Sequence, residues 1–230
     1  MKPGLELDKV VLLGRTLEEY TRYFGLTEDD LRGKKVLDVA SGVSSFTAEA
    51  RERGYDVTAF DLIYQFPLEE IQAKCEPDLD YVTKEIGKVK AYKWEFYKSP
   101  EGMRVYRERA YKRFLEDYRQ HRGTGYIFGK LPQTPFSEGQ FDLTLVSYLL
   151  FVYDDHLDYA FHKESILELL RITRGELRLY PLVNFRAEPS KHFEKIKTDP
   201  DFAPFTFEEF TTDFEFLTNS NRYLKIRRRA

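Results

Sequence analysis

The segment that most constrains this chain is a strand, a turn, a helix and a second strand packed into residues 36–61. Residues 36–39 form a compact apolar strand, and residues 40–44 form a turn of mostly small residues. A helix is expected over 45–53, and a second strand over 56–61. A unit of this length requires parallel strands joined by a right-handed crossover. The segment therefore predicts an α/β fold.

The turn and the end of the second strand together form a candidate ligand site. A small-residue turn before a helix exposes backbone N–H groups, which suit the anionic or polar end of a ligand. Asp61 ends the second strand 19 residues after Gly42, where a carboxylate can accept hydrogen bonds from both hydroxyls of a ribose. The alternative is that Gly42 only turns the chain and that Asp61 is a surface acid.

Capping and turn signals organise the rest of the chain. Thr16 and Glu19 form a capping box at the start of a short helix that Gly25 can end. The last two strands are expected to pair as a hairpin across Asn219, Ser220 and Asn221. The elements expected after residue 123 are strands over 125–128, 141–147, 176–180, 207–216 and 223–227, and a helix over 162–172 ended by Gly175.

Residues 65–123 interrupt this α/β alternation with a helical insertion inside a single domain over 1–230. Ser99 and Pro100 give a strong helix start. Between residues 84 and 122 there are twelve Lys and Arg against six Asp and Glu, although the whole chain carries a net charge of −3. The insertion is either a cap that buries its aromatic residues or a substrate lid. The charge of a lid suits a carboxylate or phosphate and, as a lesser alternative, single-stranded nucleic acid.

Composition narrows the class of protein. Hydrophobic residues make up 42% of the chain and the mean hydropathy is −0.54, which excludes a membrane protein and a fully disordered one. A single cysteine, Cys75, excludes an internal disulfide framework. The apolar run over 10–13 is too short for a signal peptide. We therefore expect a cytoplasmic protein that does not act at a membrane.

These motifs resemble the cofactor site of class I S-adenosylmethionine-dependent methyltransferases. That family has an acid in the first strand, a glycine-rich turn and a ribose-binding acid at the end of the second strand, as do Asp38, residues 40–44 and Asp61 here. The resemblance implies a Rossmann-like sheet of seven strands, mostly parallel with an antiparallel last strand, and S-adenosylmethionine as cofactor. Residues 44–50 and 153–159 resemble a bacterial subgroup. The cofactor contacts implied are Asp38, Ala40, Ser41, Gly42, Asp61, Leu62, Lys130, Leu131, Ser147 and Tyr148.

The sequence departs from the family pattern at two places. Ala40 and Ser44 stand where the family usually has glycine, although both are small enough to leave the backbone accessible. Lys130 stands where an acid usually meets the adenine amino group, and a lysine cannot accept that hydrogen bond. Adenine is then expected to be held by backbone groups near Leu131 and by apolar packing.

The segment after the fourth strand carries the candidate catalytic residues Tyr153, Asp155 and His156. Open α/β sheets place their active sites at this edge, so these residues are candidates for a general base or a substrate anchor. The alternative is that Asp154 or Asp155 caps the next helix and that His156 is solvated. No metal site is predicted, because His156 and His162 are six residues apart and point in different directions on a helix.

The function implied by the resemblance is methyl transfer from S-adenosylmethionine to an unidentified acceptor, expected to be a small molecule. Two alternatives stay open. One is a non-catalytic protein that binds S-adenosylmethionine or a partner on the same fold. The other is a nicotinamide-dependent oxidoreductase, which is disfavoured because Ala40 replaces a glycine of the dinucleotide motif.

Overall fold

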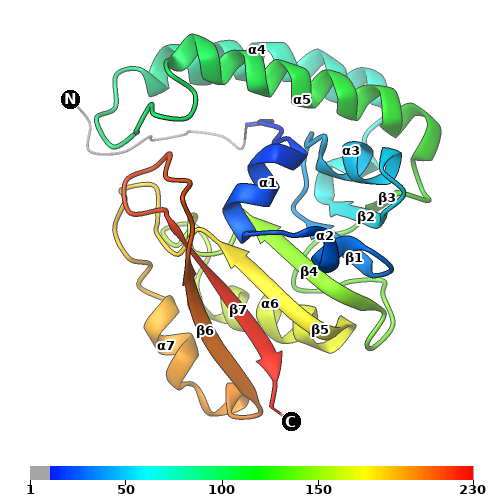
Figure 1. Ribbon diagram of the computed structural model, residues 1–230, viewed down its shortest axis with the longest axis vertical. Helices are drawn as coiled ribbons and strands as arrows, with labels where there is room; N and C mark the ends of the chain where they lie inside the picture. Colours follow the sequence, from blue (N-terminus) through cyan, green and yellow to red (C-terminus); the bar gives the residue numbers. More distant parts are fainter. Residues whose placement is uncertain (1–10, 230) are drawn as a thin grey trace.

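The computed structural model describes residues 11–229, which form one seven-stranded sheet in the order β3-β2-β1-β4-β5-β7-β6 (Figure 1). The five strands from β3 to β5 are parallel to their neighbours, whereas β7 is antiparallel to both β5 and β6. The predicted Rossmann-like sheet with an antiparallel last strand is therefore confirmed. The strands are β1 (Lys35–Val39), β2 (Asp56–Asp61), β3 (Tyr126–Phe128), β4 (Phe141–Ser147), β5 (Thr173–Tyr180), β6 (Phe205–Thr211) and β7 (Arg222–Arg228).

Helices cover both faces of the sheet because successive strand residues point to opposite sides. Val36 packs in the apolar cluster that includes α1 and α3, whereas Leu37 packs in the cluster that includes α6 and α7. The helices are α1 (Leu17–Phe24), α2 (Glu28–Leu31), α3 (Phe46–Glu52), α4 (Leu68–Ile86), α5 (Pro100–His121), α6 (Tyr159–Ile172) and α7 (Phe193–Thr198), with short 3-10 turns η1 (Leu62–Gln65) and η2 (Pro200–Phe202).

The capping signals act as predicted at α1. The Thr16 side chain accepts a hydrogen bond from the backbone N–H of Glu19, and the Glu19 carboxylate accepts one from the backbone N–H of Thr16. Gly25 ends the helix in the left-handed region, at φ 56°. The first residue of the apolar run over 10–13, Val10, lies outside the described residues.

Several boundaries differ from the sequence prediction, among them the following three. Helix α6 starts at Tyr159, capped by the side chain of Asp158, so the alternative that Asp154 or Asp155 caps it is wrong. Gly175 does not end α6 but lies inside β5, where a Cβ would stand 2.0 Å from the Asp142 carbonyl oxygen of β4. The glycine thus allows close strand approach at a register shift. The tail strand predicted over 207–216 runs over Phe205–Thr211 instead.

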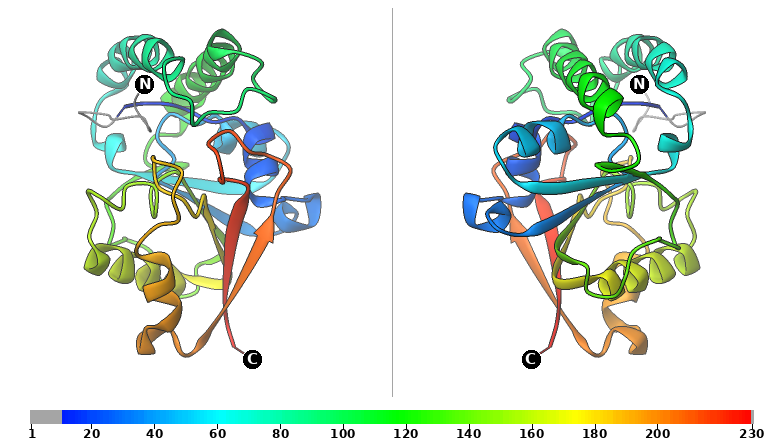
Figure 2. Two further views of the ribbon diagram at one scale, coloured as in Figure 1. Left: turned by 90° about the vertical axis from the view of Figure 1, so that its left-hand side faces the viewer. Right: turned by 90° about the vertical axis from the view of Figure 1, so that its right-hand side faces the viewer.

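The insertion between β2 and β3 forms two long helices, α4 and α5, packed side by side over the carboxyl edge of the parallel strands (Figure 2). The N-cap of α5 is Ser99, as the sequence predicts. Met103, Ala110 and Phe114, which recur at helical spacing in α5, are buried. We call α4 and α5 the cap helices. Within residues 11–229, we find no helix that is long and apolar enough to cross a membrane.

Candidate active site

The turn after β1 has a backbone that glycine adopts easily and other residues adopt rarely. Ala40 and Gly42 both lie in the left-handed region, at φ 56° and 57°. The Ala40 N–H donates to the Phe60 carbonyl oxygen of β2 at 2.9 Å, and the Ser44 N–H donates to the Ser41 carbonyl oxygen at 3.1 Å. A Cβ at Gly42 would meet nothing within 4 Å. The turn therefore presents open space at Gly42, where backbone is accessible to a ligand.

Asp61 at the end of β2 holds this turn. Its Oδ2 accepts a hydrogen bond from the Gly42 N–H at 2.8 Å, and its Oδ1 accepts one from the Ile63 N–H at 2.8 Å. Burial raises the pKa of the Asp61 carboxyl, while these backbone hydrogen bonds act in the opposite direction. Each carboxylate oxygen has two lone pairs, so Asp61 retains acceptor capacity toward a ligand.

Asp38 lies fully buried in β1 on the face of the sheet covered by α1. Its Oδ1 accepts a hydrogen bond from the Tyr20 hydroxyl at 2.8 Å, and that hydroxyl accepts one from the Ser147 side chain of β4 at 3.0 Å. Burial, and to a lesser extent the charge of Asp61, raises the pKa of Asp38 to about 7. Sequence reasoning missed Tyr20, because its contact with Asp38 depends on how α1 docks.

Two buried polar atoms at the turn form no hydrogen bond of normal geometry within the described chain: Oδ2 of Asp38 and Oγ of Ser41, although the Ser41 hydroxyl lies near enough to Asp38 to lower its pKa. Buried polar atoms in proteins are nearly always hydrogen-bonded, so each exception needs an explanation. A ligand with hydrogen-bond donors at the carboxyl end of β1 would satisfy Asp38.

Apolar side chains lie beside Asp61. Leu62, which follows it in the chain, is 47% exposed, and Phe128, its register partner on β3, is 51% exposed. The Phe128 side chain has no sequence signal that distinguishes it from a buried strand residue. Lys130 is exposed and pairs through its backbone with Gln133, and Leu131 is half-buried against the cluster that includes α6.

At the end of β4, Tyr148 follows Ser147 in the left-handed region, at φ 54°. Its N–H donates to the Tyr180 carbonyl oxygen at 2.8 Å, and its ring packs edge-on to Tyr23 and Tyr180. A non-glycine residue with this backbone is uncommon and marks strain that the surrounding contacts must hold. The structure thus brings the predicted residues Asp38, Ser147 and Tyr148 to one edge of the sheet.

The three catalytic candidates lie together in the turns after β4. The Tyr153 ring is 6.2 Å from the His156 ring, measured between ring centroids. Asp155 forms an ion pair with Arg186 and a second one with Lys191 at 3.4 Å, and the hydrogen bond from Arg186 is the main cause that lowers the Asp155 pKa. A carboxylate held in this way is a weak base. His156 is exposed, and its catalytic role stays a prediction.

His162 is fully buried. Its Nε2 accepts a hydrogen bond from the Phe151 N–H at 3.0 Å, and its Nδ1 donates to the Asp158 carbonyl oxygen at 2.8 Å. Both ring nitrogens therefore serve the backbone of the segment after β4. Within the described residues, no three His, Cys, Asp or Glu side chains come together as a set of metal ligands.

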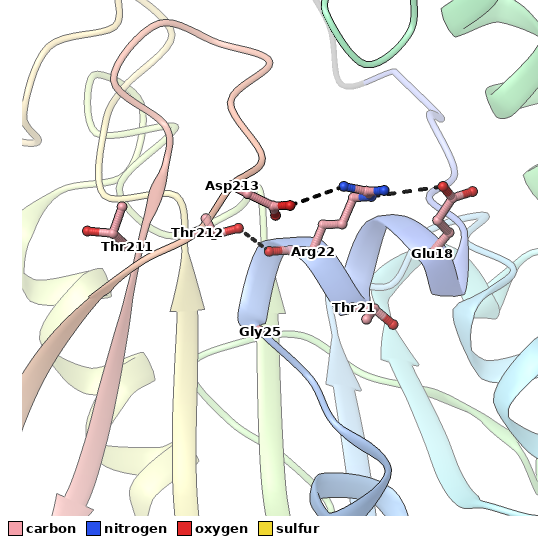
Figure 3. Close-up of a pocket in the computed structure, with 7 residues that line it drawn as sticks. All are labelled: Glu18, Thr21, Arg22, Gly25, Thr211, Thr212 and Asp213. Atoms are coloured by element: carbon pink, nitrogen blue, oxygen red, sulfur yellow. Dashed lines mark hydrogen bonds and ion pairs between the residues drawn. The ribbon is translucent and has the colours of Figure 1, made fainter.

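A separate open groove of about 520 Å³ lies between α1 and the end of β6 (Figure 3). Its charged side chains already pair with each other: Arg22 contacts Asp213 at 3.3 Å and Glu18 at 3.9 Å. Glu18 and Arg22 lie on the more exposed face of α1, whereas Tyr20 on its buried face contacts Asp38. The groove is therefore distinct from the site at the Gly42 turn.

Comparison with known proteins finds a relative with a similar sequence over nearly the whole chain. No protein-family model matches it. An uncharacterized protein of Methanocaldococcus jannaschii, MJ0045, is 43% identical over 226 residues, covering 97% of this chain and 99% of that protein. This relative is archaeal, whereas the resemblance in the sequence pointed to a bacterial subgroup.

Solved structures share the fold at low identity. A crystal structure described as a putative zinc-dependent alcohol dehydrogenase from Rhodobacter sphaeroides is 13% identical, covers 95% of this chain and 92% of that chain, and superposes with a TM-score of 0.54. Magnesium protoporphyrin IX methyltransferase from Synechocystis PCC 6803 is 14% identical, with coverage of 93% and 78% and a TM-score of 0.49. From its identity to MJ0045 and the order and direction of its strands, the chain belongs to the family of that archaeal protein and has the fold of class I S-adenosylmethionine-dependent methyltransferases.

Proposed function

We propose that this protein binds S-adenosylmethionine and transfers its methyl group to a nucleophile on a small-molecule acceptor. One observation carries the proposal: the open Gly42 turn, held by Asp61, lies next to the buried, unpaired Oδ2 of Asp38 at the carboxyl edge of the sheet. Ligands of open α/β sheets bind at this edge. The fold and the unsatisfied polar atoms therefore support the same position for the bound ligand.

The residues present fit the cofactor part by part. Asp38 and Ser41 offer partners for the ammonium group of the methionyl end, because a buried carboxylate favours a nearby cation. Asp61 has acceptor capacity for the ribose hydroxyls, and the exposed side chains of Leu62 and Phe128 offer an apolar surface for adenine. Lys130 offers no acceptor for the adenine amino group, so backbone carbonyls near Leu131 would have to take that role.

The bound cofactor would supply an electrophilic methyl group, and the contribution of the chain would be to align the acceptor and exclude water. The cap helices lie over this edge of the sheet (Figure 1). His156 is the candidate to take or orient the acceptor's proton, since it is exposed in the turns after β4 and a neutral imidazole nitrogen can accept a proton. Asp155 serves better as an anchor for Arg186 than as a base.

The acceptor is proposed to be small because basic residues of the insertion already pair with acidic neighbours. Arg104 pairs with Asp80, Arg113 pairs with Glu52 at 3.2 Å, and Lys93 pairs with Glu215 at 2.7 Å. Charges neutralised in this way leave few cations for a phosphate backbone.

The insertion is either a lid that moves during binding or a cap that stays fixed. The buried ion pair between Arg107 of α5 and Glu19 of α1, at 2.6 Å, supports a fixed cap. Hydrogen exchange followed by mass spectrometry separates the two. A lid exchanges faster than β1 and β4 in the free protein and slows when ligands bind, whereas a cap is protected throughout.

A non-catalytic S-adenosylmethionine-binding protein is the second candidate. The ion pairs of Asp155 favour it, because they remove one of the three candidate bases in the turns after β4 and leave Tyr153 and His156. Turnover with an acceptor is the measurement that separates this candidate from an enzyme.

The first experiment is mass spectrometry of small molecules released from protein purified under native conditions, followed by titration calorimetry with S-adenosylmethionine and with NAD. Release or binding of S-adenosylmethionine or S-adenosylhomocysteine supports the proposal. Binding of NAD alone would replace it with an oxidoreductase function.

A further inference from the structure

Residues 11–16, which we call the N-terminal strap, are fastened directly to the Gly42 turn. The Arg15 N–H donates to the Ser44 side-chain oxygen at 2.9 Å, and the Arg15 carbonyl oxygen accepts from the Ser45 N–H at 2.9 Å. A Cβ at Gly14 would stand 2.2 Å from the Val43 carbonyl oxygen. Only glycine permits this approach, so the strap and the turn are in close backbone contact.

The cap helices fasten the strap from the other side. The Leu12 N–H donates to Oδ2 of Asp78 in α4 at 2.9 Å. The Gly14 carbonyl oxygen accepts a hydrogen bond from the Arg107 guanidinium of α5 at 3.0 Å. With partners on both sides, the backbone at Arg15 has a fixed position at the ligand-binding edge.

The Arg15 side chain is a cation without a matching anion. Its guanidinium lies 4.5 Å from the centre of the Tyr148 ring, and its Nη1 donates to the Leu13 carbonyl oxygen. Its Nε is buried and has no hydrogen-bond partner, and within residues 11–229 no carboxylate forms an ion pair with it. Glu19 is the nearby acid: the charge of Arg15 helps to lower its pKa, but its direct ion pair, at 2.6 Å, is with Arg107.

Arg107 and Arg178, which are fully buried, each have carboxylate partners. Arg107 pairs with Glu19, and Arg178 pairs with Asp30 and Glu176. Arg15 has no carboxylate paired with it, although the hydrogen bonds of the strap fix its backbone in place. A guanidinium fork matches a carboxylate with two parallel hydrogen bonds. The Arg15 guanidinium is therefore positioned to bind an anionic group of a ligand.

We propose that Arg15 binds the carboxylate of the methionyl end of S-adenosylmethionine, an inference that rests on the proposed function. The methionyl end is a zwitterion, so it needs an anionic and a cationic partner close together. Asp38, next to the turn, has the unpaired carboxylate oxygen, and Arg15, bound to the same turn, has the unpaired guanidinium nitrogen. Tyr148 lies under the guanidinium and directly follows Ser147, which links to Asp38 through Tyr20.

The test compares two ligands by titration calorimetry: S-adenosylmethionine, and 5′-methylthioadenosine, which lacks the amino-acid end. Arg15→Gln should weaken S-adenosylmethionine binding about 10- to 100-fold, the size expected for a charged hydrogen-bonded pair. It should leave methylthioadenosine affinity within about two-fold of the unmodified protein. Arg15→Lys should restore part of the loss, since it keeps the charge without the fork.

Arg22→Gln is the matched control. Arg22 also lies over a ring, 5.1 Å from the centre of Phe96, but its charge is paired with Asp213 and Glu18. It should change neither affinity. Thermal unfolding of each variant shows whether it is folded, and Arg15→Lys stands in for Arg15→Gln if the latter is not.

Three results overturn the inference. Unchanged S-adenosylmethionine affinity in Arg15→Gln shows that Arg15 does not contact the cofactor. A carboxylate of the acceptor is then the anion for Arg15 to bind. Equal weakening of both ligands shows that Arg15 acts through the shape of the turn. If the unmodified protein binds neither ligand, the proposed function itself fails, which is distinguishable because the failure precedes any substitution.

Discussion

The Gly42 amide donates a hydrogen bond of 2.8 Å to Oδ2 of Asp61, so the carboxylate that ends β2 fixes the turn that follows β1. A second amide, that of Ile63, donates to Oδ1 of the same carboxylate at 2.8 Å. The residue expected to contact a ribose therefore also shapes the turn that would contact the rest of the ligand. A substitution at Asp61 affects both.

Replacement of Asp61 by alanine should weaken S-adenosylmethionine binding by about 1.5–3 kcal/mol, the usual size for a hydrogen bond to a charged group. Asp61→Asn keeps one acceptor oxygen and should lose less. Titration calorimetry measures both. Asp56→Ala is the control, because Asp56 is an exposed residue at the opposite end of β2. Unchanged affinity in a folded Asp61→Ala protein would remove Asp61 from the site.

Stability should fall as the pH rises toward 7 because of Asp38. Burial raises its pKa from 3.8 to about 7 in the folded chain, so between these values the folded state holds a proton that the unfolded state has lost. The free energy of unfolding then decreases with pH, by at most about 1.4 kcal/mol per pH unit for this one group.

Asp38→Asn should remove most of that dependence and make the protein more stable than the unmodified chain at pH 8. A smaller slope should remain, because burial also raises the pKa of Asp61. Urea unfolding at several pH values between 4 and 8 gives the two curves. Parallel curves would show that Asp38 is ionised throughout this range in the folded protein.

Removal of the Arg107 guanidinium should destabilise the protein strongly. Arg107→Met leaves the fully buried Glu19 carboxylate without its cation, and breaking a buried ion pair in this way costs about 3–5 kcal/mol. Chemical denaturation measures the loss. Arg104→Gln, which removes a more exposed pair with Asp80 on the same helix, should cost less than about 1 kcal/mol. Equal effects in the two variants would contradict a special role for Arg107.

Once an acceptor is known, substitution of His156 tests whether the turns after β4 carry chemistry. His156→Asn and His156→Gln should lower turnover at saturating cofactor by about 10²- to 10⁴-fold if the imidazole acts as general base. Asp155→Asn should have a smaller effect, because Asp155 is held by Arg186. Full turnover in all three variants would mean that catalysis rests on positioning alone.

The sequence by itself determined the parts of this protein that depend on neighbouring residues. The bounds of β2 and β4, the capping box at Thr16 and Glu19, and the N-cap Ser99 were all predicted, because capping and strand alternation act over a few residues. The separation of Gly42 and Asp61 along the chain could also be interpreted from the sequence, since a single crossover connects the two strands that they follow and end.

The tertiary structure decided what depends on how distant segments dock. Tyr20 reaches Asp38, and Arg15 reaches Ser44 and Tyr148, only because α1 and the strap pack across the end of β1. Gly175 reads locally as a helix stop, yet close approach to β4 places it within a strand. Side-chain partners separated by tens of residues leave no periodic pattern in the sequence, so the contacts of Arg15 and the raised pKa of Asp38 depend on packing.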